Sequence, residues 1–184
     1  IDLHIISPQP EKYFDRIKEL QIEYVSLQYE ELRGVPQIPH GTNTKFGLAL
    51  SNDTSIKDIF NSLPFGEGWG EVMSFIMMMC TVPGQSGGVF SKENFQKIIE
   101  CRHLFPKMQV QVDGGVNDQV AYILRLLGVN SIVSGSYLMK HESLGAGMLS
   151  FHKAPNGNQN THAISDFATP VKYLPVLNDR EINF

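Results

Sequence analysis

Cysteine is scarce in this 184-residue sequence, which contains two, Cys80 and Cys101. Two cysteines do not make the disulfide framework of a small secreted domain, so we expect a reducing, cytoplasmic compartment. No secretory signal peptide is visible either. The sequence begins at Ile1, inside a strand-like run, and we therefore expect its natural N-terminus to be missing.

Long apolar runs and runs of basic residues are lacking as well. The longest apolar-rich stretch extends from Val72 to Val82, which is shorter than the roughly 20 residues that a membrane-spanning helix needs. It is typical of a strand that is buried on both faces. Lysine and arginine form no run and the formal net charge is −4, so we expect neither a membrane nor a nucleic-acid partner.

The apolar fraction of 42% and the charged fraction of 18% are those of an ordinary globular chain. Strand-like and helix-like segments alternate from the first residue to about residue 140, which predicts a parallel sheet with right-handed crossovers. Glycine and proline interrupt the remainder, so we expect residues 141–184 to be an irregular extension with at most one short strand. The expected strands are residues 1–6, 22–28, 45–50, 72–79, 108–113 and 130–134, and the expected helices are residues 11–20, 55–63, 92–104 and 117–127.

The stretch QVDGGVND, residues 111–118, places an acid and two glycines between a strand and a helix. Asp-Gly is often a hairpin turn. Here the following residues have apolar side chains at helical spacing, at positions 120, 123, 124 and 127. The stretch is therefore half of a βαβ unit, and backbone N–H groups of Gly114 and Gly115 near a helix N-terminus suit an anion such as phosphate.

Alternation along the strands indicates which polar side chains face inward. In MQVQVD, Asp113 is the last residue of its face, and in a (β/α)8 barrel that position lies at the C-terminal mouth, where such barrels carry their chemistry. His4 points the same way near the end of the first strand. An imidazole and a carboxylate that converge there could share a divalent metal. Taken alone, however, a lone histidine is more often a structural residue, and a lone Asp before Gly is more often a turn former.

The segments DLHII, YVSLQYEE, KFGLAL, MMMCTVPGQSGGVF, VQVDGGVN and IVSGSYLM together resemble the ribulose-phosphate 3-epimerase family, read from its third barrel strand onward. The resemblance covers about residues 1–140. It implies an α/β fold, a (β/α)8 TIM barrel of the ribulose-phosphate-binding type that lacks its first two strands in this sequence. It also implies a cytoplasmic homo-oligomer whose partner is a small sugar phosphate.

The resemblance assigns roles to individual residues. Asp113 corresponds to the catalytic acid/base aspartate, which is also a metal ligand, and His4 to a metal-ligand histidine beside the substrate. The metal would be zinc, iron, manganese or cobalt. Met79 corresponds to a methionine over the reacting carbons, although core filling is the competing explanation. The other expected substrate-binding residues form three phosphate-gripping turns: Gly84, Gln85, Ser86 and Gly87; Gly114 and Gly115; Gly135 and Ser136.

The sequence also departs from the family pattern. The family loop P-G-F-G-G-Q reads P-G-Q-S-G-G here, with changes at Gln85, Ser86 and Gly88. Gln28 stands where the fourth strand of the family has histidine. The family segment H-x-D-x-M-D-G, which supplies a second metal-binding histidine and the second catalytic aspartate, is not found in these residues.

The resemblance implies metal-assisted epimerisation that interconverts D-ribulose 5-phosphate and D-xylulose 5-phosphate through an enediolate. Two alternatives stay open: a degenerate sugar-phosphate-binding barrel without catalysis, which the altered loop favours, and an epimerase for another ketose phosphate. A Schiff-base lyase would need a lysine at a strand end. Lys45 begins its strand instead, so nothing in the sequence supports that reaction.

Overall fold

The computed structural model describes residues 1–39, 41–62, 73–81, 87–152 and 176–178. Strands and helices alternate along most of this chain, as the sequence predicts. The strands are β1 (Asp2–Ile6), β2 (Tyr24–Gln28), β3 (Lys45–Leu50), β4 (Met73–Met79), β5 (Gln109–Asp113), β6 (Ser131–Val133) and β7 (Val176–Asn178). The α-helices are α1 (Phe14–Glu19), α2 (Ile56–Ser62), α4 (Glu93–Leu104), α5 (Asp118–Leu126) and α6 (Leu144–Ser150), and the 3-10 helices are η1 (Pro10–Tyr13), η2 (Tyr29–Glu31) and η3 (Leu138–Lys140).

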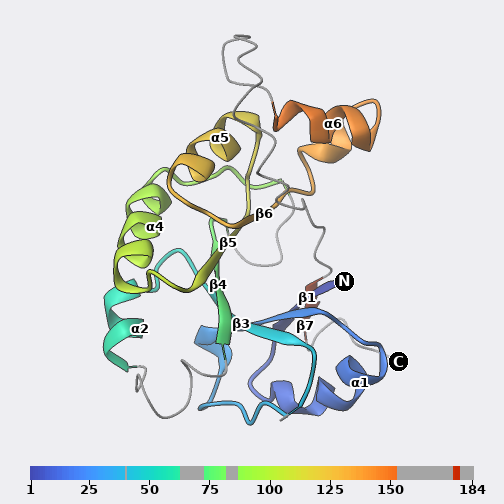
Figure 1. The fold of residues 1–184 in the computed structure, drawn as a ribbon, viewed down its shortest axis with the longest axis vertical. Helices are drawn as coiled ribbons and strands as arrows, with labels where there is room; N and C mark the ends of the chain where they lie inside the picture. Colours follow the sequence, from blue (N-terminus) through green and yellow to red (C-terminus); the bar gives the residue numbers. More distant parts are fainter. Residues whose placement is uncertain (40, 63–72, 82–86, 153–175, 179–184) are drawn as a thin grey trace.

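The strands form one curled sheet in the order β6-β5-β4-β3-β2-β1-β7. Each pair of neighbouring strands is parallel. Strands β1 to β6 follow one another in chain order, each beside the next, which is the arrangement of consecutive strands in a (β/α)8 barrel. The prediction of a partial barrel with six parallel strands is confirmed, and Figure 1 shows the sheet curling past the helices.

Two segments differ in detail from the prediction. The helix expected over residues 11–20 is divided into η1 and α1, and Pro10 begins the 3-10 turn because its fixed φ suits a first helical position. The extension after residue 140 contains helix α6, which Ser143 caps by accepting a hydrogen bond from the Ala146 N–H at 3.2 Å. The backbone of β7 adds to the free edge of β1, with His4 opposite Val176. The domain boundary near residue 140 stays a prediction.

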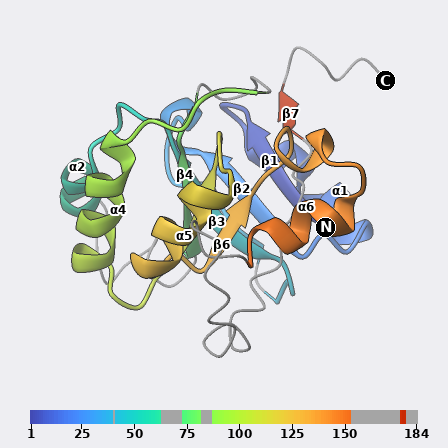
Figure 2. The ribbon, with the colours of Figure 1, turned by 90° about the horizontal axis from the view of Figure 1, so that it is seen from above.

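Alternation divides the sheet into two faces that bury different side chains. The outer face packs its aliphatic side chains, such as Val25, Leu48 and Val112, against the helices in the main hydrophobic core. Figure 2 shows α2, α4 and α5 outside the strands on one side and α1 on the other. The inner face carries a second, smaller cluster, which consists of Ala49, Phe75, Met77, Met79 and Val133 with Tyr24 packed against it.

No helix of the described chain is long and apolar enough to cross a membrane.

A close approach on the inner face gives a prediction about stability. A Cβ added at Gly47 would lie 2.5 Å from the Phe75 ring, because the two residues are register partners. We expect Gly47→Ala to displace the ring and to lower the free energy of unfolding by about 1–3 kcal/mol, as overpacking does. Urea-induced unfolding measures the difference.

Gly34→Ala is the matched control, because a Cβ there meets nothing within 4 Å. We expect its free energy of unfolding to stay close to that of the wild type. The second substitution Phe75→Leu should recover part of the loss in Gly47→Ala. Equal stability of the two alanine variants would contradict the packing described for the inner face.

Candidate active site

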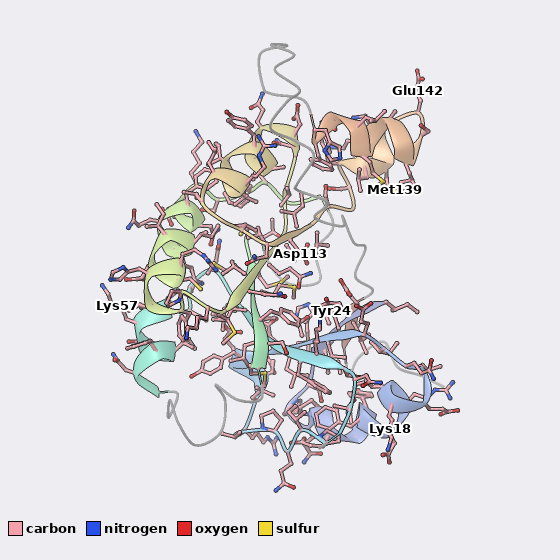
Figure 3. All side chains as sticks on the ribbon, in the orientation of Figure 1. Lys18, Tyr24, Lys57, Asp113, Met139 and Glu142 are labelled. Atoms are coloured by element: carbon pink, nitrogen blue, oxygen red, sulfur yellow. The ribbon has the colours of Figure 1, made fainter. Side chains whose placement is uncertain are left out.

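Asp113 is the last residue of β5 and belongs to the inner face of the sheet. Figure 3 shows it near the middle of the molecule, whereas the labelled Lys18, Lys57 and Glu142 lie at the periphery. Burial raises the pKa of the half-buried Asp113 carboxyl to about 6, and the hydrogen bond from the Gly114 backbone N–H opposes this in part. A carboxyl with a pKa near neutrality can both accept and return a proton under physiological conditions.

His4 lies in the middle of β1 and is completely buried. Its Nε2 is 2.8 Å from Oε1 of Gln28. Its Nδ1 has no hydrogen-bond partner among the described residues. Burial lowers the pKa of His4 to about 4, against the opposing influence of the Gln28 hydrogen bond and the Glu30 charge. The imidazole is therefore neutral at pH 7, which is the form that binds a metal.

The register of the sheet relates the heights of His4 and Asp113. Successive strand pairs connect His4 to Ser26, Gly47, Phe75 and Gln109. Gln109 precedes Asp113 by four residues on the same face. A barrel of eight strands with a shear of about eight staggers its strands by about four residues over half its circumference. The four-residue offset between Gln109 and Asp113 is therefore the one expected if His4 and Asp113 lie at the same height on opposite walls of the barrel.

Met79 is the register partner of Asp113 on the neighbouring strand and is almost fully buried. It belongs to the inner cluster with Met77 and Phe75. This position satisfies both explanations that the sequence left open, because the side chain fills the inner core and also lies beside the candidate acid/base group. Its role over a substrate stays a prediction.

The turns after β4, β5 and β6 meet at one pocket. Gly87, Gly115 and Ser136, one from each turn, line an open pocket of about 520 Å³ together with the N-terminal parts of α4 and α5. Lys92 and Lys140 also line it and supply positive charge. Three of the predicted phosphate-binding residues are therefore brought together. Gly114 and Gly135 belong to the same turns without lining the pocket, and Gly84, Gln85 and Ser86 lie outside the described residues.

The glycines after β5 are needed because two backbone segments come close together. A Cβ on Gly115 would lie 2.3 Å from the Phe90 backbone nitrogen, and one on Gly114 would lie 2.5 Å from the Thr81 hydroxyl oxygen. Both glycines have positive φ, 109° at Gly114 and 67° at Gly115, which other residues rarely adopt. Two residues later Asn117 begins helix α5, and its side chain accepts a hydrogen bond from the Val120 N–H at 2.9 Å.

The donor atoms of the site fit a divalent metal in kind. A neutral imidazole with a bare Nδ1 and the Asp113 carboxylate are ligands that such ions accept. Within the described part of the chain, however, no group of three or more His, Cys, Asp or Glu residues gathers to hold a metal. The assignment of His4 and Asp113 as metal ligands stays a prediction.

A model of the ribulose-phosphate 3-epimerase family matches residues 1–139. The chain belongs to this family. The match covers all of the strands that carry the pocket and both metal-ligand candidates. The family membership that the ordered motifs predicted is therefore confirmed.

Individual relatives agree with the family match. A ribulose-phosphate 3-epimerase of Schizosaccharomyces pombe is 27% identical over 145 residues, which are 77% of this chain and 60% of the relative. The cytoplasmic isoform of ribulose-phosphate 3-epimerase from Oryza sativa is 22% identical over 87% of this chain and 70% of the relative. The enzyme of the same name from Chlamydia pneumoniae is 33% identical over 53% of this chain and 42% of the relative. The chain thus spans between about two fifths and seven tenths of the length of these curated relatives.

Sequence reasoning noted Gln28 only as a departure from the family pattern and gave it no role. The structure places its buried side chain between His4 and Glu30. One signal was available, since alternation in YVSLQ puts Gln28 on the same inward face as Ser26 and Tyr24. The partners themselves lie on other segments, and a single sequence does not pair them.

The close approach at Gly115 gives a second prediction. We expect Gly115→Ala to destabilise the protein by more than Gly128→Ala. Both glycines have positive φ, but a Cβ at Gly128 meets only Arg102 Nε, at 3.6 Å, whereas one at Gly115 meets backbone. The positive φ alone accounts for about 1–2 kcal/mol in each variant. Gly115→Ala should therefore also displace the pocket lining and weaken binding of inorganic phosphate.

Urea-induced unfolding and phosphate titration by calorimetry measure the two effects. If both variants lose the same stability and both keep phosphate binding, the turn after β5 does not approach the segment before α4 as described.

Proposed function

We propose that the protein is an epimerase that interconverts D-ribulose 5-phosphate and D-xylulose 5-phosphate. The observation that carries the proposal is the Asp113 carboxyl at the C-terminal end of an inner-face strand, with a pKa raised to about 6 and a glycine turn beside it. Family membership and the names of the relatives support the same reaction.

Inversion of a carbon next to a carbonyl needs a proton removed from one face and a proton added to the other. Asp113 serves as one of these two acid/base groups, and an enediolate forms between the two proton transfers. The family resemblance assigns the second group to the H-x-D-x-M-D-G segment, which is not found in the 184 residues. Asp113 alone therefore accounts for one half of the exchange.

The phosphate binds at the pocket between the three turns. Backbone N–H groups of Gly115 and of the residues around Ser136 hold its oxygens, and Lys92 and Lys140 increase the positive potential at the pocket. Phosphate binding at a distance from the reacting carbon fixes the substrate in one orientation over Asp113. Met79 beside Asp113 gives that part of the site an apolar wall that excludes water.

A divalent metal, when bound by His4 and Asp113 with further donors, would stabilise the negative charge that develops on the substrate oxygens. Within this chain, the contribution of His4 is a neutral, buried imidazole with a bare nitrogen. The contribution of Asp113 is a carboxylate at the end of its strand.

A barrel that binds a sugar phosphate without turnover is the second candidate. The observation that favours it is the altered phosphate loop, in which Gln85, Ser86 and Gly88 depart from the family pattern. An epimerase for a different ketose phosphate would use the same residues, and turnover assays with several ketose phosphates distinguish it.

Cys80 and Cys101 are buried free thiols, and burial raises the pKa of each to about 12. Free thiols agree with a cytoplasmic location.

The central test is the variant Asp113→Asn in the full protein. It keeps the size of the side chain and removes the proton acceptor, so we expect epimerisation of ribulose 5-phosphate to fall roughly 10²–10⁴-fold. Binding of the sugar phosphate should persist, because the glycine turns are unchanged. Near-normal turnover by the variant would refute the role of Asp113.

Stability provides the control for that experiment. Because the folded-state pKa of Asp113 is raised, the charged carboxylate disfavours the folded state above pH 6, and this effect disappears as the pH falls below the unfolded value of 3.8. Asp113→Asn should therefore unfold at the same or a higher temperature than the wild type at pH 7. Asp15→Asn, on the exposed part of α1, should leave both turnover and stability unchanged.

The titration of Asp113 gives a further prediction. In the metal-free protein we expect its carboxyl to titrate with a pKa near 6, well above the 3.8 of an ordinary aspartate, because it is buried. A divalent metal bound to the carboxylate would lower this pKa. Carboxyl ¹³C shifts of the metal-free protein followed against pH measure it, and a pKa near 3.8 would contradict the burial described for Asp113.

A further inference from the structure

A buried chain of hydrogen bonds ends at His4. The Gln28 side chain lies between two groups, with Oε1 at 2.8 Å from His4 Nε2 and its own Nε2 at 2.5 Å from Glu30 Oε2. The same amide nitrogen is 3.0 Å from the Ser51 hydroxyl oxygen. Glu30 is fixed in turn by the Ser51 backbone N–H at 2.8 Å and by the Thr54 hydroxyl. The Gln28 amide therefore has contacts on both sides and little freedom to rotate.

The carboxylate of Glu30 determines the direction of every bond in this chain. An ionised carboxylate accepts hydrogen bonds and donates none. Burial acts to raise the pKa of Glu30, but the hydrogen bonds from Thr54, Gln28 and Ser51 outweigh it and lower the pKa, so the group is ionised. The nitrogen of the Gln28 amide must then face Glu30 and its oxygen must face His4. Since an amide oxygen only accepts, His4 Nε2 carries a hydrogen and donates it.

The second nitrogen of His4 is consequently bare. Nδ1 is buried and has no hydrogen-bond partner among the described residues. A hydrogen there would leave an unpaired donor, and a charge, in a buried position, which is costly. The imidazole thus presents the lone pair of Nδ1 from the inner face of β1, the face that also carries Asp113 on β5.

We propose that Gln28 is a positioning residue for His4. It holds the imidazole as the Nε2–H tautomer, so that Nδ1 is the atom that binds a divalent metal. The proposal rests on the metal site of the proposed function. Glu30 and Ser51 contribute because they fix the orientation of the Gln28 amide. A free amide could turn by 180° and present its NH₂ group to His4, which would favour the opposite tautomer.

Selection of one His4 tautomer depends on glutamine at position 28. A histidine, the residue that the family resemblance places here, both donates and accepts and therefore leaves the tautomer of His4 open. Glutamine alone would leave it open too, because its amide has two ends. The combination of Gln28 with an ionised Glu30 removes that freedom, and partners of this kind typically change metal affinity by roughly 10–100-fold.

The first measurement is the tautomer of His4 in the metal-free full protein, read from the ¹⁵N shifts of its ring by long-range ¹H–¹⁵N correlation. We expect Nε2 to carry the hydrogen. In Gln28→Leu, which removes the acceptor, we expect a mixture of tautomers and a Zn²⁺ affinity that is lower by roughly 10–100-fold. The affinity is measured by competition with a chromophoric chelator.

The second measurement uses the exchanged pair Gln28→Glu with Glu30→Gln. The carboxylate introduced at position 28 still accepts from His4 Nε2, and the amide introduced at position 30 still donates to it. We expect the Nε2–H tautomer and nearly wild-type Zn²⁺ affinity. Ser26→Ala is the matched control, because its hydroxyl lies on the same face of β2 but donates to the Leu3 carbonyl. It should leave the tautomer and the Zn²⁺ affinity unchanged.

A wild-type His4 with the hydrogen on Nδ1 would overturn the proposal, and so would an unchanged tautomer and affinity in Gln28→Leu. If Gln28→Leu does not fold, the proposal is still tested by the tautomer of the wild type and by the tautomer and Zn²⁺ affinity of the exchanged pair. Failure of the proposed reaction is a separate result. A protein that never epimerises ribulose 5-phosphate, yet shows the expected tautomer and loses Zn²⁺ affinity in Gln28→Leu, supports this inference and refutes the reaction.

Discussion

The period of two along a parallel strand is the constraint on which the site depends. Successive side chains of each strand point alternately toward the helices and toward the inner face of the curled sheet. The position of a residue in this alternation therefore decides which face it lies on. The outward residues form an apolar core with the helices, made of aliphatic side chains and of aromatic ones such as Phe46. The buried polar residues Asp2, His4, Ser26, Gln28 and Gln111 fall on the opposite face. A shift of one residue in any strand would bury its polar side chains in the apolar core and turn its apolar side chains to the inner face.

Placing polar groups on a buried face requires that their hydrogen bonds be made, and the chain does this locally on one wall. Gln28, Glu30, Ser51 and Thr54 satisfy one another where β2 and β3 end. Lys97 of α4 contributes from outside by donating to the carbonyls of Ser51 and Asn52, at 2.5 Å and 3.3 Å. The ends of two strands are thereby tied to a helix, and the side chain that contacts His4 is held from behind. A rigid support of this kind is what a metal-ligand or catalytic side chain needs.

Much of this arrangement could be predicted from the sequence. The spacing of apolar residues and the positions of the glycine turns predicted the order of strands and helices up to about residue 140. They also predicted that Asp113 is the last residue of its strand and faces inward. The convergence of Gly87, Gly115 and Ser136 followed from the rule that parallel strands end at one edge. The network around Gln28 could not be predicted, because His4 and Ser51, two of the partners of Gln28, lie 24 and 23 residues away from it along the chain. The division of the first helix also escaped prediction, since η1 and α1 have one continuous helical pattern in the sequence.

The inner face explains why the two titratable candidates shift in opposite directions. On β4, between β5 and the β1–β2 wall, the inner face carries the buried apolar side chains of Phe75, Met77 and Met79. Loss of hydration always disfavours the charged form, so burial on this face lowers the pKa of His4 and raises that of Asp113. Each shift is the one its proposed task requires. The imidazole is kept neutral for a metal, and the carboxyl is brought near the pH at which it can take and return a proton. Charged neighbours would have had to be arranged separately for each group, whereas burial adjusts both from a single cause.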